Sequence, residues 1–428
     1  MGTHADLLAR HRKVVPSWIA LYYDDPISIV RGDGRHVWDA EGNRYIDLFG
    51  GILTTMVGHG VPEVVEAIRE QAGKILHTST LYLIEPMIAL AEKIGTLSEI
   101  PDAKVFFTNS GSEANDAALL LATTLRSSNQ IVTLRGSYHG RSFSTMPITN
   151  VGSWKSSSYS PFQVSYVHGG YRYRSPFGHL PDDAYIDACV ADLREVLSMQ
   201  SGGVAAMIAE PIQGVGGFIT PPDGLLGRYY ELLSEQGALF ISDEVQTGWG
   251  RTGEHFWGYQ AHGFVPDMLT FAKGVGNGLA MGGVVARAEV MDCVKGNSIS
   301  TFGGNPLASA GAMATLEYLL DHDLQTNAVK VGNQILNRFR DIGENNPIIG
   351  EVRGKGLMCG VELVKPGTKT PDAAAATAIL EGAKKAGVLI GKGGLAGNVL
   401  RVAPPLSLTE DEATEAMDAI AEVFAGLL

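Results

Sequence analysis

The sequence has few cysteines, no long hydrophobic run and fewer basic than acidic residues. Its three cysteines, Cys189, Cys293 and Cys359, are odd in number and far apart, so they predict neither a disulfide framework nor a metal site. No apolar run reaches the roughly 18 residues that a membrane-spanning helix needs, and the first residues lack the hydrophobic stretch of a signal peptide. The net charge of −13 disfavours nucleic acids and anionic membranes as partners. We therefore expect a cytoplasmic protein.

The chain is long enough for a large core and more than one domain: it has 428 residues, of which 45 % are hydrophobic and 18 % charged. Up to about residue 55, two alternating apolar stretches flank glycine-containing turns, which is typical of a small antiparallel meander. From about residue 60, helical patterns alternate with short apolar strands, which predicts the α/β class with a mostly parallel sheet. The predicted strands are 105–108, 131–134, 164–167, 205–209, 239–242, 268–271 and 283–286.

From about residue 310 the pattern changes to one long helix, followed by further strands and a helix near 373–386. This order is typical of a separate, smaller α+β domain. We therefore expect an N-terminal segment at 1–55, a large domain at 56–312 and a C-terminal small domain at 313–428.

Two of the apolar runs end in ionisable side chains thirty residues apart. Leu-Phe-Ile-Ser is followed by Asp243, and Leu-Thr-Phe-Ala is followed by Lys273. Runs of this kind indicate buried parallel strands, whose carboxyl ends carry the ligand site of an α/β sheet. Desolvation lowers the pKa of a lysine toward that of a reactive amine, which Schiff-base chemistry needs. A carboxylate at the same edge suits a protonated pyridine nitrogen, so the pair predicts pyridoxal phosphate (PLP) as cofactor.

A stretch of small residues follows the strand at 105–108 and opens a helix. Ser110, Gly111 and Ser112 would let backbone N–H groups approach an anion at the helix N-terminus. The same residues also fit an ordinary N-cap with Glu113 in the first turn. Thr301 could add a phosphate donor, although its surroundings alone indicate a turn.

Other polar side chains stand at the ends of predicted strands. Tyr138 could stack on a flat cofactor, whereas His139 on its own is more typical of a structural histidine. Glu210 ends another apolar strand and is either catalytic or the partner of an arginine. Arg401 lies between apolar residues, so it needs a carboxylate partner, which belongs either to the protein or to a substrate.

Together these stretches resemble the class III PLP-dependent aminotransferases of fold type I over nearly the whole chain, in order and in spacing. Within the class, residues 77–80, 149–152 and 255–260 are most similar to the alanine–glyoxylate, or 3-aminoisobutyrate–pyruvate, aminotransferase branch. The resemblance implies a small domain built from both chain ends. The matching stretches are 109–115, 135–140, 209–214, 243–251, 273–278, 301–306 and 352–357.

The resemblance implies a role in cofactor binding for each matched residue. Lys273 would form the Schiff base with the cofactor, Asp243 would pair with the pyridinium nitrogen, and Gln246 would contact the ring hydroxyl. The remaining contacts would come from Ser110, Gly111 and Ser112 at the phosphate, from Tyr138 and His139 beside the ring, and from Thr301 of the partner subunit.

For the substrate, the resemblance implies that Arg401 grips a carboxylate and that Glu210 neutralises this arginine otherwise. Tyr82 and the stretch Gly50 to Thr54 would line the pocket. Family members are homodimers with shared active sites, and the residues do not distinguish a dimer from a tetramer.

The implied reaction is a ping-pong transfer of an amino group. The donor would be β-alanine, 3-aminoisobutyrate or alanine, and the acceptor a 2-oxo acid such as pyruvate or glyoxylate. Three alternatives stay open: a transaminase for 4-aminobutyrate, ornithine or a simple amine, a PLP-dependent lyase or aminomutase on the same scaffold, and a non-catalytic protein that kept the fold.

Overall fold

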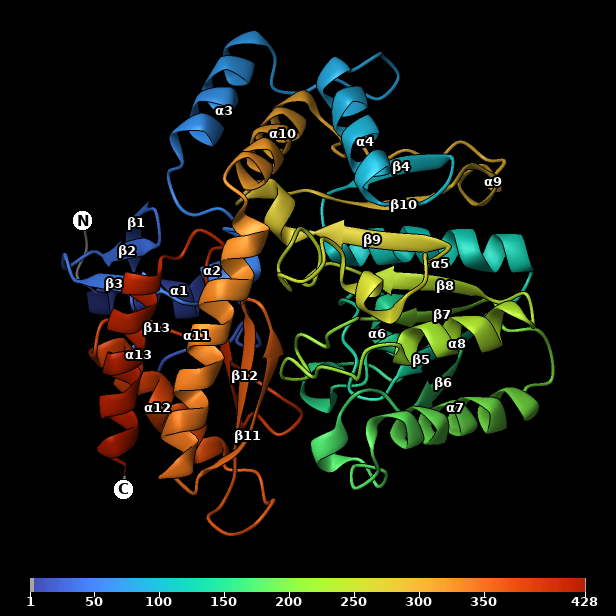
Figure 1. The fold of residues 1–428 in the computed structure, drawn as a ribbon. Coiled ribbons are helices and arrows are strands. Elements are labelled where there is room, and N and C mark those ends of the chain that lie inside the picture. The colour runs from blue at the N-terminus through green and yellow to red at the C-terminus, as the bar shows by residue number, and fades with distance from the viewer. Residues whose placement is uncertain (1–3, 428) are drawn as a thin grey trace.

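A seven-stranded sheet forms the centre of the computed structural model, which describes residues 4–427 (Figure 1). Strands β6, β5, β7, β8 and β9 lie side by side in this order and run parallel to one another. Strand β10 is antiparallel to both of its neighbours, β9 and β4. The predicted α/β class with a mostly parallel sheet is therefore confirmed. In spatial order the strands are β4 (Ala103–Thr108), β10 (Gly282–Arg287), β9 (Met268–Ala272), β8 (Leu239–Asp243), β7 (Ala206–Ala209), β5 (Gln130–Leu134) and β6 (Gln163–Val167).

The two faces of this sheet are covered by different helices because successive side chains of a strand point to opposite faces. In β7, Met207 and Ala209 pack with α7 (Asp182–Ser198) and α8 (Leu225–Ser234). Ala206 and Ile208 pack instead with α5 (Gly111–Arg126) on the other face. The central strands β5, β7, β8 and β9 are therefore buried on both sides, which is why they read as uninterrupted apolar runs, whereas the edge strands β4 and β6 are partly exposed.

Residues from both ends of the chain share a second sheet. The predicted meander consists of β1 (Ile29–Asp33), β2 (His36–Asp39) and β3 (Arg44–Asp47), and β13 (Val388–Leu389) adds to β3 in parallel. A third sheet has the order β11 (Ile349–Lys355), β12 (Met358–Leu363), β15 (Val399–Val402) and β14 (Gly391–Gly393), and its neighbours are antiparallel. The division of the chain at residues 55 and 312 stays a prediction.

The single long helix expected from about residue 310 is wrong. Two helices, α10 (Pro306–Asp321) and α11 (Leu324–Glu344), are separated by His322 and Asp323. Asp323 has φ +47°, a left-handed conformation that aspartate tolerates better than most residues and that ends a right-handed helix. The small-domain helices α12 (Ala373–Lys385) and α13 (Glu410–Ala425) each begin at a side-chain N-cap, at Asp372 and Thr409.

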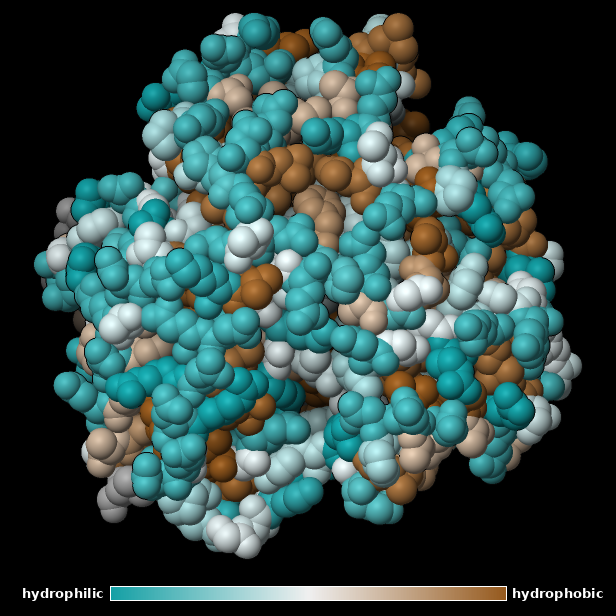
Figure 2. Space-filling model, in the orientation of Figure 1, coloured by the Kyte–Doolittle hydropathy of each residue, from teal (hydrophilic) through white to brown (hydrophobic). Residues whose placement is uncertain are grey.

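The remaining helices lie around these sheets, and none of the helices within residues 4–427 has the length and apolar character of a membrane span. The face in Figure 2 is mostly polar, but apolar residues gather at the top of the view, over the segment that joins α3 to α4. The other helices are α1 (His4–Val14), α2 (Gly50–Leu53), α3 (Pro62–Lys74), α4 (Glu85–Leu97), α6 (Thr145–Ile148) and α9 (Ala288–Met291).

Candidate active site

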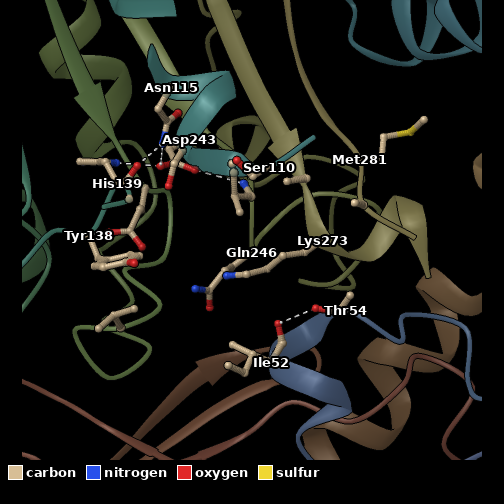
Figure 3. Close-up of a pocket in the computed structure, with 18 of the residues that line it drawn as sticks. Ile52, Thr54, Ser110, Asn115, Tyr138, His139, Asp243, Gln246, Lys273 and Met281 are labelled. Atoms are coloured by element: carbon tan, nitrogen blue, oxygen red, sulfur yellow. Dashed lines mark hydrogen bonds and ion pairs between the residues drawn. The ribbon is translucent and has the colours of Figure 1, made fainter. Parts of the chain in front are cut away.

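Lys273 and Asp243 line one pocket of about 460 Å³ at the carboxyl ends of two neighbouring parallel strands (Figure 3). Asp243 is the last residue of β8 and lies opposite Thr270 of β9, and Lys273 directly follows β9. The structure thus brings the acid and the amine to the same edge of the sheet, as their positions in the sequence predict.

The backbone and the surroundings of Lys273 both set its side chain apart. Burial and the positive charge of Arg401 lower the pKa of Lys273 to about 8. Its φ is +50°, a left-handed conformation that costs a residue with a Cβ about 1–2 kcal/mol. The lysine therefore leaves the strand in a strained conformation and carries an amine that loses its proton near pH 8.

Three groups of the protein hold the carboxylate of Asp243 in place. The amide Nδ2 of Asn115 and the ring Nδ1 of His139 lie 2.8 Å and 2.7 Å from its Oδ2 atom. The backbone N–H of Val245 donates to Oδ1 at 3.2 Å. His139 in turn lies 3.1 Å from the hydroxyl of Thr133. His139 therefore orients the carboxylate of Asp243 within the pocket.

Asn115 is a site residue that the sequence reasoning assigned no role. It lies on α5 and contacts Asp243 and the backbone oxygen of His139 through Nδ2, while its Oδ1 accepts from Thr270. Asn115 follows Ser112 by three residues, so both lie on the face of α5 that points toward the pocket. This spacing is the feature of the sequence that indicates a site residue at Asn115.

The N-terminus of α5 opens into the same pocket. Ser110 caps the helix by accepting from the N–H of Glu113, and Gly111 and Ser112 follow at the pocket wall. Gly140 packs against this turn with φ +128°, and a Cβ there would lie 2.4 Å from the Ser112 hydroxyl oxygen. This close packing of a helix N-terminus suits a phosphate group.

The pocket also contains buried polar atoms that are free to bind a cofactor or a substrate. Within residues 4–427 the buried Oε1 of Gln246 and the buried Nε of Arg401 have no hydrogen-bond partner. Tyr138 lines the wall, with its ring edge-on to that of Trp154 at 5.6 Å between centroids. An aromatic wall, an anion-binding turn, an amine and a carboxylate together fit an aromatic aldehyde that carries a phosphate.

The expected ion pair between Glu210 and Arg401 is not formed. Glu210 accepts from the backbone N–H groups of Tyr138 and Gly214, both at 2.9 Å. Arg401 donates to the carbonyl oxygens of Gly214 and Lys392, both at 3.3 Å. Burial raises the pKa of Glu210 to about 7, so its charge and its attraction for Arg401 are reduced at neutral pH.

The stretch expected to line the pocket after Gly50 does so through a left-handed turn. The residues of α2 have φ between +55° and +66°, which is strained for the β-branched Ile52. Gly51, Ile52 and Thr54 line the pocket, and Ile52 and Thr54 lie on the wall opposite Asp243 (Figure 3).

Two predicted site residues do not reach this pocket from their own chain. Tyr82 and Thr301 are both exposed and are absent from its lining. The expected role of Thr301 in the site of a partner subunit stays a prediction, and Tyr82 does not line the pocket of its own chain as expected. Residues without an assigned role that line the pocket include Trp154, Val215, Leu279, Ala280 and Met281.

Known proteins resemble this chain over nearly its whole length. The family model described as aminotransferase class III matches residues 21–424. Alanine–glyoxylate aminotransferase 2 homolog 2, mitochondrial, from Arabidopsis thaliana is 40 % identical over 97 % of this chain and 87 % of that protein. An acetylornithine aminotransferase from Mycolicibacterium smegmatis is 39 % identical, and the match covers 91 % and 92 % of the two chains. Among solved structures, a PLP-bound amine transaminase from an uncultivated Pseudomonas species has a TM-score of 0.89 and 31 % identity, with 96 % and 98 % coverage.

Proposed function

Because this chain belongs to the class III aminotransferases, which are PLP-dependent enzymes, we propose that it transfers an amino group from a small amino acid to a 2-oxo acid. The proposed donors are β-alanine, 3-aminoisobutyrate and alanine, and the proposed acceptors are pyruvate and glyoxylate. The observation that carries this proposal is the presence of Lys273, Asp243 and Arg401 in one pocket. The similarity to an alanine–glyoxylate aminotransferase supports the choice of substrates.

When bound, PLP supplies an aldehyde that captures an amine and a protonated ring that accepts electrons from the donor carbon. Lys273 would hold the cofactor and then move the proton of the donor carbon, because its pKa of about 8 suits both gain and loss of a proton near neutral pH. Asp243 would keep the ring nitrogen protonated, and Asn115 and His139 keep its carboxylate in place. Ser110, Gly111 and Ser112 would bind the phosphate.

Arg401 would bind the carboxylate of the donor and of the acceptor. Its guanidinium lies between the rings of Phe49 and Phe218, with its central carbon 4.9 Å and 5.6 Å from their centroids. Its two carbonyl contacts are long, and its Nε atom has no partner within the described residues. A carboxylate can therefore bind without first displacing Glu210 from an ion pair.

We also propose that the protein is a homodimer and that Tyr82 and Thr301 serve the site of the partner subunit. The support is an apolar surface between α3 and α4, where Leu83 is 92 % exposed. The segments 75–83 and 299–302 belong to one surface, because the rings of His77 and Phe302 lie 5.1 Å apart. A stable dimer would bury this surface. Its exposed apolar residues are Ile75, Leu76, Leu81, Tyr82, Leu83, Ile299 and Phe302.

A second candidate function is transamination of a longer donor such as ornithine or acetylornithine. The similarity to an acetylornithine aminotransferase favours it. Because burial raises the pKa of Glu210 to about 7, part of this group is neutral at neutral pH, which suits the uncharged side chain of acetylornithine better than the charged one of ornithine.

The test is a titration of the PLP-loaded protein with single amino donors in the absence of any acceptor. Conversion of bound PLP to pyridoxamine phosphate, followed by absorbance, reports the first half of the reaction. Conversion by β-alanine, 3-aminoisobutyrate and L-alanine is the expected result. Conversion by ornithine, acetylornithine or 4-aminobutyrate alone would replace the proposed donors with the second candidate. Lys273→Ala is the control and should not convert PLP with any donor.

A further inference from the structure

The carboxylate-binding Arg401 rests against one tight turn, residues 214–218, that follows β7. Arg401 donates to the carbonyl oxygen of Gly214, and the N–H groups of Gly217 and Phe218 donate to that same oxygen at 3.1 Å and 3.3 Å. The N–H of Gly214 binds Glu210 at 2.9 Å. The turn therefore contacts both Arg401, which is proposed to bind the substrate carboxylate, and Glu210, which lies in the same pocket.

A second arginine, outside the pocket, holds the other end of this turn. The Nε atom of Arg353 donates to the carbonyl oxygen of Gly217 at 3.0 Å. Arg353 on β11 lies opposite Gly360 on β12, and Gly360 lies opposite Arg401 on β15. The two arginines thus occupy one row of the sheet on either side of a glycine, and each binds one carbonyl group of the same turn.

The glycine between the two arginines leaves space for the turn. A Cβ at Gly360 would lie 2.8 Å from the oxygen of Gly217 and 3.3 Å from the Cβ of Phe218. The turn therefore sits directly on the backbone of β12, and any side chain at this position would displace it.

Arg353 is itself fixed by a buried ionic network. Its Nη1 atom donates to Glu362 at 2.7 Å, and its guanidinium lies 4.9 Å from the ring centroid of Tyr171. Glu362 is fully buried and also accepts from Arg174 at 2.6 Å. Because buried charges stay paired, Arg353 cannot rotate freely and forms a rigid support for the turn.

We propose that Arg353 is a positioning residue for substrate carboxylates, acting through the turn 214–218 on Arg401. This inference rests on the proposed function, in which Arg401 binds the carboxylate. The inference adds that the binding of the substrate carboxylate by Arg401 depends on the hydrogen bond between Arg353 and Gly217, which lies outside the pocket. A shift of the turn would move both Gly214 contacts, whereas the binding of the cofactor through Lys273 would stay unchanged.

The chain offers a matched pair of substitutions. Arg353→Lys keeps a positive charge beside Glu362, but one ammonium group cannot replace the two nitrogens that bind Glu362 and Gly217 at once. Arg174→Lys makes the same change in the other arginine that contacts Glu362. Among residues 4–427, Arg174 has no hydrogen bond to the turn 214–218. Gly360→Ala moves the turn by a different route and leaves the ionic network intact. Arg401→Gln removes the grip itself.

We would measure the rate at which PLP-loaded protein reacts with each of two probes that carry the same reactive group. Aminooxyacetate carries a carboxylate and O-methylhydroxylamine does not, and each consumes the bound PLP with a change in absorbance. The ratio of the two second-order rate constants measures the carboxylate grip without turnover. The rate for O-methylhydroxylamine alone reports whether the cofactor site is intact, and a thermal melt reports folding.

We expect Arg353→Lys and Gly360→Ala each to lower the ratio by about 10-fold, the size expected when a positioned group moves by a fraction of an ångström. The rate for O-methylhydroxylamine should stay unchanged, and Arg174→Lys should keep the wild-type ratio. A wild-type ratio in both Arg353→Lys and Gly360→Ala, with a lowered ratio in Arg401→Gln, would overturn the inference and leave the proposed function standing. An unchanged ratio in Arg401→Gln would overturn both. If Arg174→Lys lowers the ratio as much as Arg353→Lys does, the effect belongs to the ionic network in general, and this result would also overturn the inference.

Discussion

Replacing Lys273 with methionine should change how the stability of the cofactor-free protein depends on pH. The pKa of Lys273 is lowered from 10.5 to about 8 in the folded protein, chiefly by burial. The folded state therefore binds the proton of this amine more weakly than the unfolded state does. The charged lysine destabilises the fold in full below about pH 8, and this penalty disappears as the pH rises toward 10.5.

The size of the penalty follows from the difference between the two pKa values. A difference of about 2.5, at about 1.4 kcal/mol for each pKa unit, corresponds to about 3 kcal/mol at pH 7. Lys273→Met removes the charge, while the strained φ of +50° is the same in both proteins. The difference in unfolding free energy between variant and wild type should therefore fall by about 2 kcal/mol between pH 7 and pH 9.5.

The assay is urea denaturation of both proteins after removal of the cofactor, at one protein concentration and at several pH values. Equal concentration matters because association contributes to the stability of an oligomer. The packing of methionine adds an offset that is independent of pH, so the slope carries the test. A difference that stays constant from pH 7 to 9.5 would refute the lowered pKa. Lys273→Gln, a second neutral replacement, should give the same slope with another offset.

Asp243→Asn should keep the fold and lower kcat by at least about 100-fold, because the cofactor ring loses the carboxylate that keeps it protonated; steady-state kinetics and a circular dichroism spectrum check this. Gly227→Ala in α8 should destabilise the protein by more than about 1 kcal/mol, since its Cβ would lie 2.1 Å from a backbone carbonyl oxygen. In Gly73→Ala, in α3, the new Cβ meets nothing within 4 Å, so this change should stabilise the protein by about 0.5–1 kcal/mol. Urea midpoints of Gly227→Ala and Gly73→Ala that shift in the same direction from wild type would contradict this reasoning. Leu83→Asp should dissociate the proposed dimer in sedimentation velocity, whereas Met199→Asp, also at an exposed apolar residue, should leave it intact.

The placement of Lys273 and Asp243 could be predicted from the sequence because parallel strands end at a common edge. Asp243 ends β8 and Lys273 follows β9, so both residues lie at the edge formed by the carboxyl ends of the parallel strands. The same reasoning placed Ser110 and Tyr138 at the pocket wall, because each follows a strand of the same sheet. The local sequence pattern is therefore enough to predict where these residues lie, and no long-range contact has to be known.

The partners of the charged residues could not be predicted in this way. Glu210 was expected to pair with Arg401, but two backbone N–H groups of neighbouring loops already satisfy its carboxylate. The contact of the Nδ1 atom of His139 with Asp243 was likewise not predicted, whereas the expected role of His139 in cofactor binding stays a prediction. Which of several donors reaches a carboxylate depends on the course of loops far apart in the sequence.

The sequence by itself determined the order of strands and helices, the apolar runs that are buried on both faces, and the residues that stand at the strand ends. These properties follow from side-chain periodicity and from the chemistry of single residues. Only the tertiary structure decided that Arg353 and Arg401 share one row of a sheet and one turn, although they lie 48 residues apart. Such a contact depends on strand register and on a glycine that leaves room for another loop, and neither is visible in the order of residues alone.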